Sequence, residues 1–207
     1  MIKQAISSLV IFIAIFVTHM VAHTEISELT KKAMQSPPEK EIKFYYHTMP
    51  YYEFTNFWLA PVNIDNKIWP STEHYYQAQK FIGPHEDIQE KIRLLPTPSE
   101  VYKLANSRNG TEKDKIRKDW NEIMVDVMRK AVRAKFEQHP DLMKVLKSTG
   151  NSLLIEYSKN DGFWGVANKD RTGYSEVTPL NDWLGKLLME IRDGKQIYNY
   201  NPNDYKK

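Results

Sequence analysis

One helical stretch, Pro70–Phe81, constrains the fold of this chain most, because it carries ionisable side chains among aromatic residues. Pro70 and Ser71 predict a helix start, since proline fits the first turn and a serine side chain accepts hydrogen bonds from free N–H groups. No helix-breaking residue follows before Phe81. At 3.6 residues per turn, one stripe of this helix consists of Glu73, Tyr76, Gln77 and Lys80.

This polar stripe allows two interpretations. Glutamate, glutamine and lysine are costly to bury without partners, so their position between aromatic residues indicates the polar floor of a pocket. In the other interpretation the helix is half exposed, and Glu73 complements the dipole of its first turn.

Composition excludes several kinds of site. The net charge of +3 is too small to argue for nucleic-acid binding by itself. The absence of cysteine excludes disulfides, thiolate catalysis and cysteine-based zinc sites. The six histidines are spread over the chain, which gives little support to a histidine-based metal site. We therefore expect neither a metal nor another cofactor.

The N-terminus has the pattern of an export signal. Lys3 precedes an apolar run from Leu9 to Val17, which is shorter than the roughly 20 residues that a membrane-spanning helix needs. We place a cleavage site after Ala22, although Met20 fits the −3 position poorly. We expect residues 1–22 to be a signal peptide and the mature protein to be secreted, without stable membrane anchoring.

The alternative is an uncleaved N-terminus, which would leave the protein cytoplasmic or anchored to a membrane. If the chain enters a eukaryotic secretory route, Asn109 of Asn109-Gly110-Thr111 becomes a glycosylation acceptor.

The rest of the chain predicts an α+β fold, a mainly helical single domain with a small β-sheet over residues 42–193. Residues 23–41 are polar and contain Pro37-Pro38, so we expect a mobile linker with at most one helical turn at 26–34. The polar residues 194–207 are expected to form a flexible tail.

Local patterns place the individual elements. Strands are expected at 42–46, 58–64, 67–69 and 153–157, with a hairpin turn at Asp65-Asn66. Helices are expected at 71–81, at 86–94, at 99–106 with Ser99 as its cap, from 114 or 115 to 136, at 141–148 and at 183–192.

Several motifs of rare residues then occur in one order. Trp69–Phe81 matches W-P-[ST]-x-E-H-x-x-Q-A-x-K-F, and Phe54-Thr55-Asn56-Phe57 precedes it. Further matching segments are 118–120, 127–128, 134–140, 149–151, 161–165 and 184–192. From about Ile42 to Arg192, the chain thus resembles the NADAR/YbiA-like N-glycosidase family, and several motifs in one order are a specific signal.

The resemblance implies an α+β domain that hydrolyses N-glycosidic bonds of ribosylated compounds. Two substrate groups are attributed to the family: early pyrimidine intermediates of riboflavin biosynthesis, and ADP-ribose attached to guanine bases. The export signal is atypical and argues against a housekeeping riboflavin role. We therefore expect an ADP-ribose-like nucleotide-sugar partner, free or attached to nucleic acid. The alternatives are a riboflavin-intermediate N-glycosidase and a non-catalytic module that binds ADP-ribose or NAD.

The resemblance also carries catalytic or pocket roles onto the matching positions of this chain. These positions are Trp69, Glu73, His74, Gln77, Lys80, Asp161, Trp164 and Gly165.

Three side chains suit the chemistry of such a reaction. Glu73 can exchange a proton with water or a leaving base, and its place at a helix start favours the ionised form, hence a base. Asp161 lies on a glycine-flanked loop and can serve as the second carboxylate beside the glycosidic bond. Alternatively, it is an Asx-turn residue that stabilises its own loop. Lys80 can bind phosphate or attack an open-chain ribosyl aldehyde as a Schiff base, or it is a solvated helix-end lysine.

Other side chains suit binding. Trp69 and Trp164 can stack on a nucleobase, which contributes about 1–3 kcal/mol, although a tryptophan is more often a core residue. Asn56 and Gln77 can hydrogen-bond a base edge or a ribose hydroxyl. Two cations, Lys135 and Arg192, can meet phosphate or be plain surface charges.

The chain departs from the family pattern in places. The family commonly has N-x-L-G where Asp182 lies three residues before Gly185, and its asparagine is displaced to Asn181. Residues 172–180 lengthen the preceding loop. Met124 stands where the family frequently has a lysine, which makes Lys80 the better candidate for an essential amine.

Overall fold

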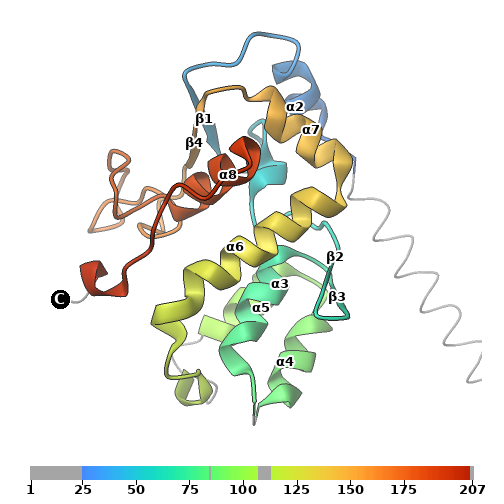
Figure 1. The fold of residues 1–207 in the computed structure, drawn as a ribbon, viewed down its shortest axis with the longest axis vertical. Helices are drawn as coiled ribbons and strands as arrows, with labels where there is room; N and C mark the ends of the chain where they lie inside the picture. The colour runs from blue at the N-terminus through green and yellow to red at the C-terminus, as the bar shows by residue number, and fades with distance from the viewer. Residues whose placement is uncertain (1–24, 84, 107–112, 206–207) are drawn as a thin grey trace, which may run out of the picture.

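The long helix α6 (Trp120–Gln138) runs between two groups of elements in the computed structural model, which describes residues 25–83, 85–106 and 113–205 (Figure 1). One group lies toward the top of Figure 1 and contains β1, β4, α2, α7 and α8, and the other contains β2, β3, α3, α4 and α5. The arrangement confirms the predicted α+β fold, which is mainly helical with few short strands.

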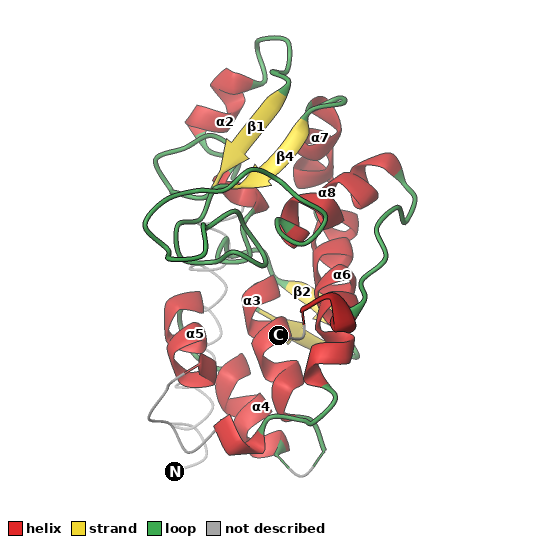
Figure 2. Ribbon diagram, turned by 90° about the vertical axis from the view of Figure 1, so that its left-hand side faces the viewer, coloured by secondary structure: helices red, strands yellow, loops and turns green. Residues whose placement is uncertain are grey.

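Two strands far apart in sequence form a parallel pair. β1 (Glu41–Phe44) pairs with β4 (Leu153–Glu156), with Phe44 opposite Glu156 (Figure 2). Parallel strands need a long crossover, and here the connection contains every helix from α3 to α7. The carboxyl ends of both strands therefore lie side by side, and α8 (Trp183–Asp193) packs against β4.

The second sheet is the predicted hairpin of β2 (Val62–Ile64) and β3 (Lys67–Trp69). Asp65 and Asn66 have φ of 54° and 60°, as a two-residue type I′ turn requires. β2 is shorter than the predicted 58–64, since Pro61 has no N–H to donate and strand pairing begins after it.

The helix α3 (Thr72–Ala78) continues into a 3₁₀ turn over Gln79–Phe81, and Ser71 caps it through its hydroxyl as predicted. α4 (Glu86–Arg93) and α5 (Pro98–Asn106) follow and pack on it. Thr97 and not Ser99 caps α5, because the Thr97 hydroxyl accepts the Glu100 N–H at 3.2 Å.

The longest helix starts later than the sequence predicts. Residues 113–115 form a separate 3₁₀ turn, and α6 begins only at Trp120. The Arg117 N–H donates to the Lys80 carbonyl at 2.9 Å, so the segment before α6 is fixed to the end of α3 and its 3₁₀ turn. The following helix, α7 (Pro140–Ser148), matches its prediction closely.

The segment predicted to be a mobile linker is docked on the domain. It contains α2 (Glu28–Ala33), where Thr30 is fully buried. The Thr30 hydroxyl donates to buried Glu53 at 2.8 Å and accepts the Tyr51 N–H at 2.6 Å. This polar network ties the segment down in spite of its polar composition.

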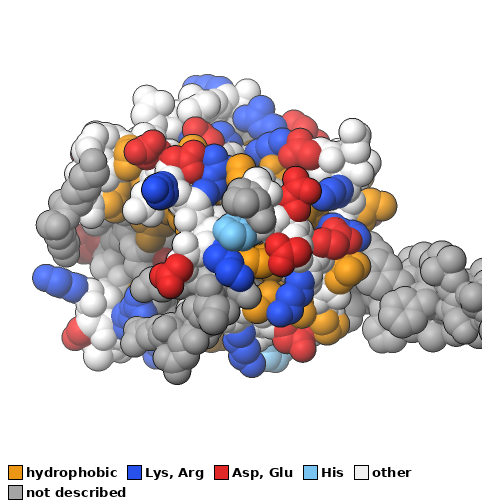
Figure 3. Space-filling model, turned by 90° about the horizontal axis from the view of Figure 1, so that it is seen from below, with side chains coloured by type: hydrophobic (Ala, Val, Ile, Leu, Met, Phe, Trp, Pro, Cys, Tyr) orange, Lys and Arg blue, Asp and Glu red, His pale blue; other side chains and the backbone are white. Residues whose placement is uncertain are grey.

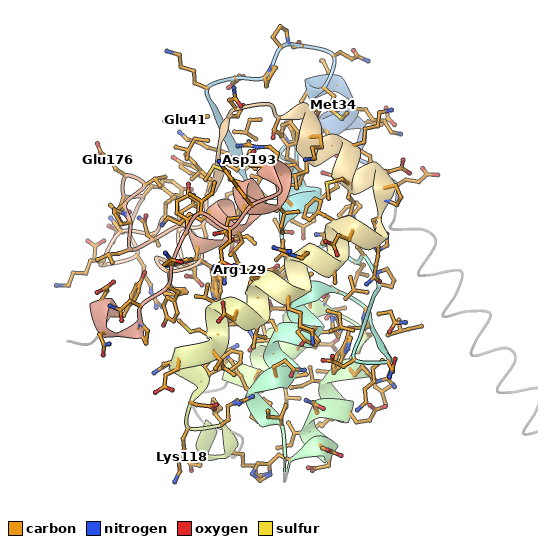
Figure 4. All side chains as sticks on the ribbon, in the orientation of Figure 1. Met34, Glu41, Lys118, Arg129, Glu176 and Asp193 are labelled. Carbon is orange, nitrogen blue, oxygen red and sulfur yellow. The ribbon has the colours of Figure 1, made fainter. Side chains whose placement is uncertain are left out.

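The tail is also packed where the sequence predicts a loose chain. Buried Glu190 on α8 accepts the N–H groups of Ile197 and Tyr198 and pairs with Arg129 at 2.9 Å. Arg129 is labelled on α6 in Figure 4. The Tyr205 hydroxyl accepts the Trp183 indole N–H at 2.6 Å. Hence two helices hold residues 197–205 in place.

Three features predicted from the sequence lie outside the described residues: the signal peptide, its cleavage site and the Asn109 acceptor stay predictions. Within the described ranges, no helix combines the length and apolar character needed to cross a membrane.

The Thr30–Glu53 contact can be tested by Thr30→Val. We expect it to lower the free energy of unfolding by about 1–3 kcal/mol, because it leaves a buried carboxyl oxygen without its donor. Urea denaturation measures the change, and Thr48→Val, at an exposed threonine, is the matched control. Equal stability of the two variants would show that α2 is not anchored through this contact.

Candidate functional site

A cavity of about 540 Å³ opens between the two groups of elements, at the carboxyl ends of β1 and β4. Its floor includes the whole polar stripe predicted on α3, which confirms the pocket interpretation of that stripe. The lining residues contributed by α3 and its 3₁₀ turn are Glu73, Tyr76, Gln77 and Lys80.

Glu73 is the buried carboxyl of this floor. Its side chain accepts a hydrogen bond from Gln77 at 2.8 Å, and its N–H donates to the Asn56 carbonyl at 3.3 Å. Burial raises the pKa of Glu73 to about 7, although Gln77 and Lys80 oppose the shift. The helix start therefore does not keep Glu73 fully ionised as the sequence predicts, since desolvation outweighs the dipole. Near neutral pH it can accept or donate a proton.

Lys80 is not a solvated helix-end lysine. Only 6% of its surface is exposed, and its ammonium donates to the Asn106 side-chain oxygen at 2.8 Å. The amine lies 5.9 Å from the centroid of the Tyr76 ring and 5.7 Å from that of Trp120. Burial lowers the pKa of Lys80 to about 8, against the attraction of Glu73. A neutral amine is thus accessible under mild conditions.

The loop after β4 brings the second predicted carboxylate to the same cavity. Asp161 lines it, and one of its oxygens accepts the N–H groups of Phe163 and Trp164 at 2.8 Å each. Asp161 therefore has the Asx-turn role and the cavity position together. Trp164 also lines the cavity and meets Tyr76 edge to face at 5.4 Å.

The two predicted amides lie in the cavity wall. Asn56 is fixed by the Thr72 hydroxyl, which donates to its side-chain oxygen at 2.9 Å. Gln77 uses its amide N–H on Glu73, while its side-chain oxygen is buried without a hydrogen-bond partner among the described residues. An unpartnered acceptor in a cavity wall suits a substrate donor.

Trp69 and His74, by contrast, are core residues and do not line the cavity. The Trp69 indole N–H donates to the Ile64 carbonyl at 3.2 Å. The His74 ring contacts the Leu95 carbonyl at 3.0 Å and the Ser71 hydroxyl at 2.8 Å, and burial lowers its pKa to about 4. His74 thus contacts the Ser71 cap of α3, and Trp69 bonds within the hairpin that precedes it.

Gly165 also lies behind the cavity wall. A Cβ at this position would come within 2.5 Å of the Glu156 carbonyl and 3.1 Å of the Ser158 Cβ. The glycine lets the Asp161 loop approach the end of β4, so its role is indirect.

The two cations predicted to meet phosphate serve the backbone instead. Buried Lys135 donates to the carbonyls of Glu53 and Thr55, at 2.5 and 2.9 Å. Arg192 donates to the Ser152 carbonyl at 2.7 Å. Both side chains thus bond to backbone carbonyls in the interior and do not face the cavity.

The departures from the family pattern are structural here. The Asn181 side chain bonds to the lengthened loop, through Thr178, Ser175 and Glu176, and it is not among the residues that line the cavity. Asp182 accepts the Glu156 N–H at 2.9 Å and so positions the end of β4.

Sequence reasoning missed much of the cavity. Its other lining residues include Glu156, Ser158 and Asn106, together with an aromatic group formed by Tyr45, Tyr46, Tyr52, Phe57 and Tyr102. One signal was available: Glu156 is an acid that ends an otherwise apolar strand. Tyr45 and Tyr46 directly follow β1. They lie near Glu156 only because β1 and β4 pair in parallel, which the sequence does not reveal.

On the face drawn in Figure 3, acidic and basic side chains are interspersed, and neither sign of charge gathers in one patch. Across the described residues, no group of three or more His, Cys, Asp or Glu side chains is arranged to hold a metal ion.

Comparison with known proteins agrees with this architecture. The NADAR domain family model matches residues 43–194. The NMR structure of the Escherichia coli protein YbiA superposes with a TM-score of 0.61 at 36% sequence identity, covering 78% of this chain and 90% of that one.

Two curated relatives carry functional names. N-glycosidase YbiA of Escherichia coli (strain K12) is 39% identical over 153 residues, which are 73% of this chain and 86% of the relative. The chloroplastic riboflavin biosynthesis protein PYRR of Zea mays is 36% identical over 167 residues, which are 76% of this chain but only 26% of that protein.

The packing of the Asp161 loop against the end of β4 can be tested at Gly165. We expect Gly165→Ala to lower the free energy of unfolding by about 1–3 kcal/mol, because the added methyl group collides with the end of β4. Gly173→Ala is the control, since its nearest neighbour would be a flexible side chain at 3.4 Å. Urea denaturation compares them, and an unaffected Gly165→Ala variant would contradict the tight packing.

Proposed function

The chain belongs to the NADAR domain family and is a hydrolase of N-glycosyl bonds, and from this premise we propose that it cleaves the C1′–N bond of an ADP-ribosylated base of guanine type or a related ribosyl nucleotide. The observation that carries the proposal is the floor of the cavity. There a buried carboxyl and a buried amine, whose pKa values are moved toward neutrality, lie beside a second carboxylate.

The reaction needs proton transfer and stabilisation of a cationic sugar. Ionised Glu73 takes a proton from water as the water oxygen bonds to C1′, and the C1′–N electron pair leaves with the base. The transition state resembles an oxocarbenium ion, which the negative charge of Asp161 stabilises. The products are the free base and the hydrolysed sugar.

Lys80 has two chemically sensible roles in this scheme. As an ammonium it can bind an anionic part of the substrate. As a neutral amine it can attack C1′ of the open-chain sugar and form an imine, which water then hydrolyses. The protonation state required differs, so a pH profile distinguishes the two roles.

The rim of the cavity supports a substrate larger than one nucleoside. Phe57 and Tyr102 are both exposed, and their ring centroids lie 6.4 Å apart. Tyr46, on the same cavity, is 40% exposed. Exposed aromatic faces at a cavity rim can stack on a flat base. An ADP-ribosyl substrate has such a base, the adenine, in addition to the base that is released from the ribose.

A pyrimidine intermediate of riboflavin biosynthesis is the second candidate substrate, and the name of the maize relative favours it. Chromatography after parallel incubation with ADP-ribosyl-guanine and with ribosylated pyrimidine intermediates tests both. Release of free guanine supports the first substrate, release of the pyrimidine supports the second, and intact but tightly bound ADP-ribose indicates a binding module.

The role of Glu73 predicts the behaviour of Glu73→Gln. We expect kcat to fall about 10²–10⁴-fold, because the general base is lost. The wild-type profile of kcat/KM should rise through about pH 7 as Glu73 ionises. A fall above about pH 8 indicates a protonated Lys80, whereas a rise there indicates the imine route. Wild-type turnover in the variant would contradict the role.

The free energy of unfolding should fall over the pH range in which the activity rises. A carboxyl whose folded pKa is raised binds its proton more tightly in the native state, so its contribution to stability is lost as pH rises from about 4.5 to about 7. The loss is of the order of 3 kcal/mol. At pH 8 Glu73→Gln should thus be at least as stable as the wild type, with exposed Glu137→Gln as the control.

The aromatic rim predicts a substrate-selective effect of Tyr102→Ala. We expect KM for ADP-ribosyl-guanine to rise about 5- to 150-fold with little change in kcat, because one stacking face is lost. Hydrolysis of a mono-ribosyl pyrimidine should be unchanged. Leu94→Ala, at another exposed apolar residue, is the control in the same kinetic assay. An equal effect on both substrates would contradict a second base at the rim.

A further inference from the structure

Glu156, the last residue of β4, is a buried carboxyl of the cavity that the scheme above does not use. Its side chain lines the cavity, and only 8% of the residue is exposed. It comes from the upper group of elements in Figure 1, while Glu73 comes from α3 in the other group. The two side chains thus line one cavity from different elements.

The backbone of Glu156 is held on several sides. Its N–H donates to Asp182 at 2.9 Å, and its carbonyl accepts the N–H groups of Ser158 at 2.9 Å and Val166 at 3.2 Å. These contacts hold the backbone at the end of the strand, from which the side chain reaches the cavity.

The carboxyl itself has no such support. Its Oε2 atom is fully buried and has no hydrogen-bond partner within the described part of the chain. No ion pair joins Glu156 to a cation among the described residues. A buried carboxyl left unpaired in a cavity that a ligand fills suits a group whose partner arrives with the substrate.

The charges around Glu156 oppose its ionisation. Burial raises its pKa well above the usual range, and the neighbouring carboxylates of Asp161, Asp182 and Glu73 raise it further. Tyr45, which follows β1, also interacts with it and titrates only at alkaline pH. Burial raises the pKa of Glu73 as well, but Gln77 and Lys80 favour its ionised form and oppose the shift. Every neighbouring charge around Glu156 disfavours ionisation, so Glu73 is the easier of the two to ionise and Glu156 the better placed to hold a proton, as a base and an acid require.

We propose that Glu156 is the general acid that protonates the departing base nitrogen, an inference that rests on the N-glycosidase function proposed above. The Glu156 O–H bond breaks and an N–H bond forms, while the C1′–N electron pair passes to the base. Water bonds to C1′ and gives a proton to Glu73. The reaction leaves Glu156 ionised and Glu73 neutral, and exchange with solvent through the open cavity restores both.

Leaving-group dependence tests this role. We expect Glu156→Gln to slow hydrolysis of ADP-ribosyl-guanine about 10²–10⁴-fold, because guanine needs protonation to leave. An ADP-ribose derivative with a p-nitrophenoxy group at C1′ releases p-nitrophenolate, a stable anion that needs no acid. The variant should cleave this compound at close to the wild-type rate. Glu122→Gln, at an exposed position of α6, should be unaffected with both. Equal losses on the two substrates would overturn the acid role.

A second measurement does not depend on turnover. In protein labelled with ¹³C at the glutamate side-chain carboxyl, a resonance of a neutral carboxyl should be present at pH 7 and absent from Glu156→Gln. An ionised resonance for Glu156 would overturn the inference even in an active enzyme. If the wild type releases no base but does show the neutral resonance, the proposed function fails and the acid role fails with it, whereas the protonation state stands.

Discussion

The burial of α3 on every side is the constraint on which the site depends. All seven residues of this helix are buried, although four of them, apart from the two tyrosines, have polar or ionisable side chains. Each polar group must then find a partner or face a cavity, because an unpaired buried polar group is costly. Thr72 and His74 find partners in neighbouring loops. Glu73 and Gln77 bond to each other and face the cavity. The helix is therefore both the centre of the fold and the floor of the site.

The same burial determines the chemistry. An exposed glutamate and an exposed lysine are both fully charged at neutral pH, and neither exchanges protons readily there. Desolvation moves the pKa of Glu73 up and that of Lys80 down, to about 7 and about 8. Two groups that titrate near working pH in one cavity are suited to move protons during hydrolysis. The free energy that burial costs the fold is thus the origin of the reactivity.

Much of this site could be predicted from local pattern. Helical periodicity placed Glu73 and Lys80 on one face, and the glycines around Asp161 predicted its loop. A motif match does not tell which of its residues face a cavity, so the resemblance gives binding roles to Trp69 and His74, although both side chains are buried in the core.

What could not be predicted depends on long-range contacts. Glu156 reaches the cavity because β4 pairs in parallel with β1, more than a hundred residues earlier. Local composition also failed at both ends of the domain. Thr30 and Glu53 fix a segment that looks like a linker, and Glu190 and Arg129 fix a tail that looks loose. A few buried polar contacts outweigh a polar sequence in these segments.

If the bond to be cleaved lies above the buried floor of α3, a crystal structure of Glu73→Gln with uncleaved ADP-ribosyl-guanine bound should show it. We expect C1′ over the side chain at position 73, with Asp161 and Glu156 near the ribose and the departing base. A ligand seated elsewhere, for example in the open groove between α2 and α7, or with its ribose turned away from α3, would contradict it.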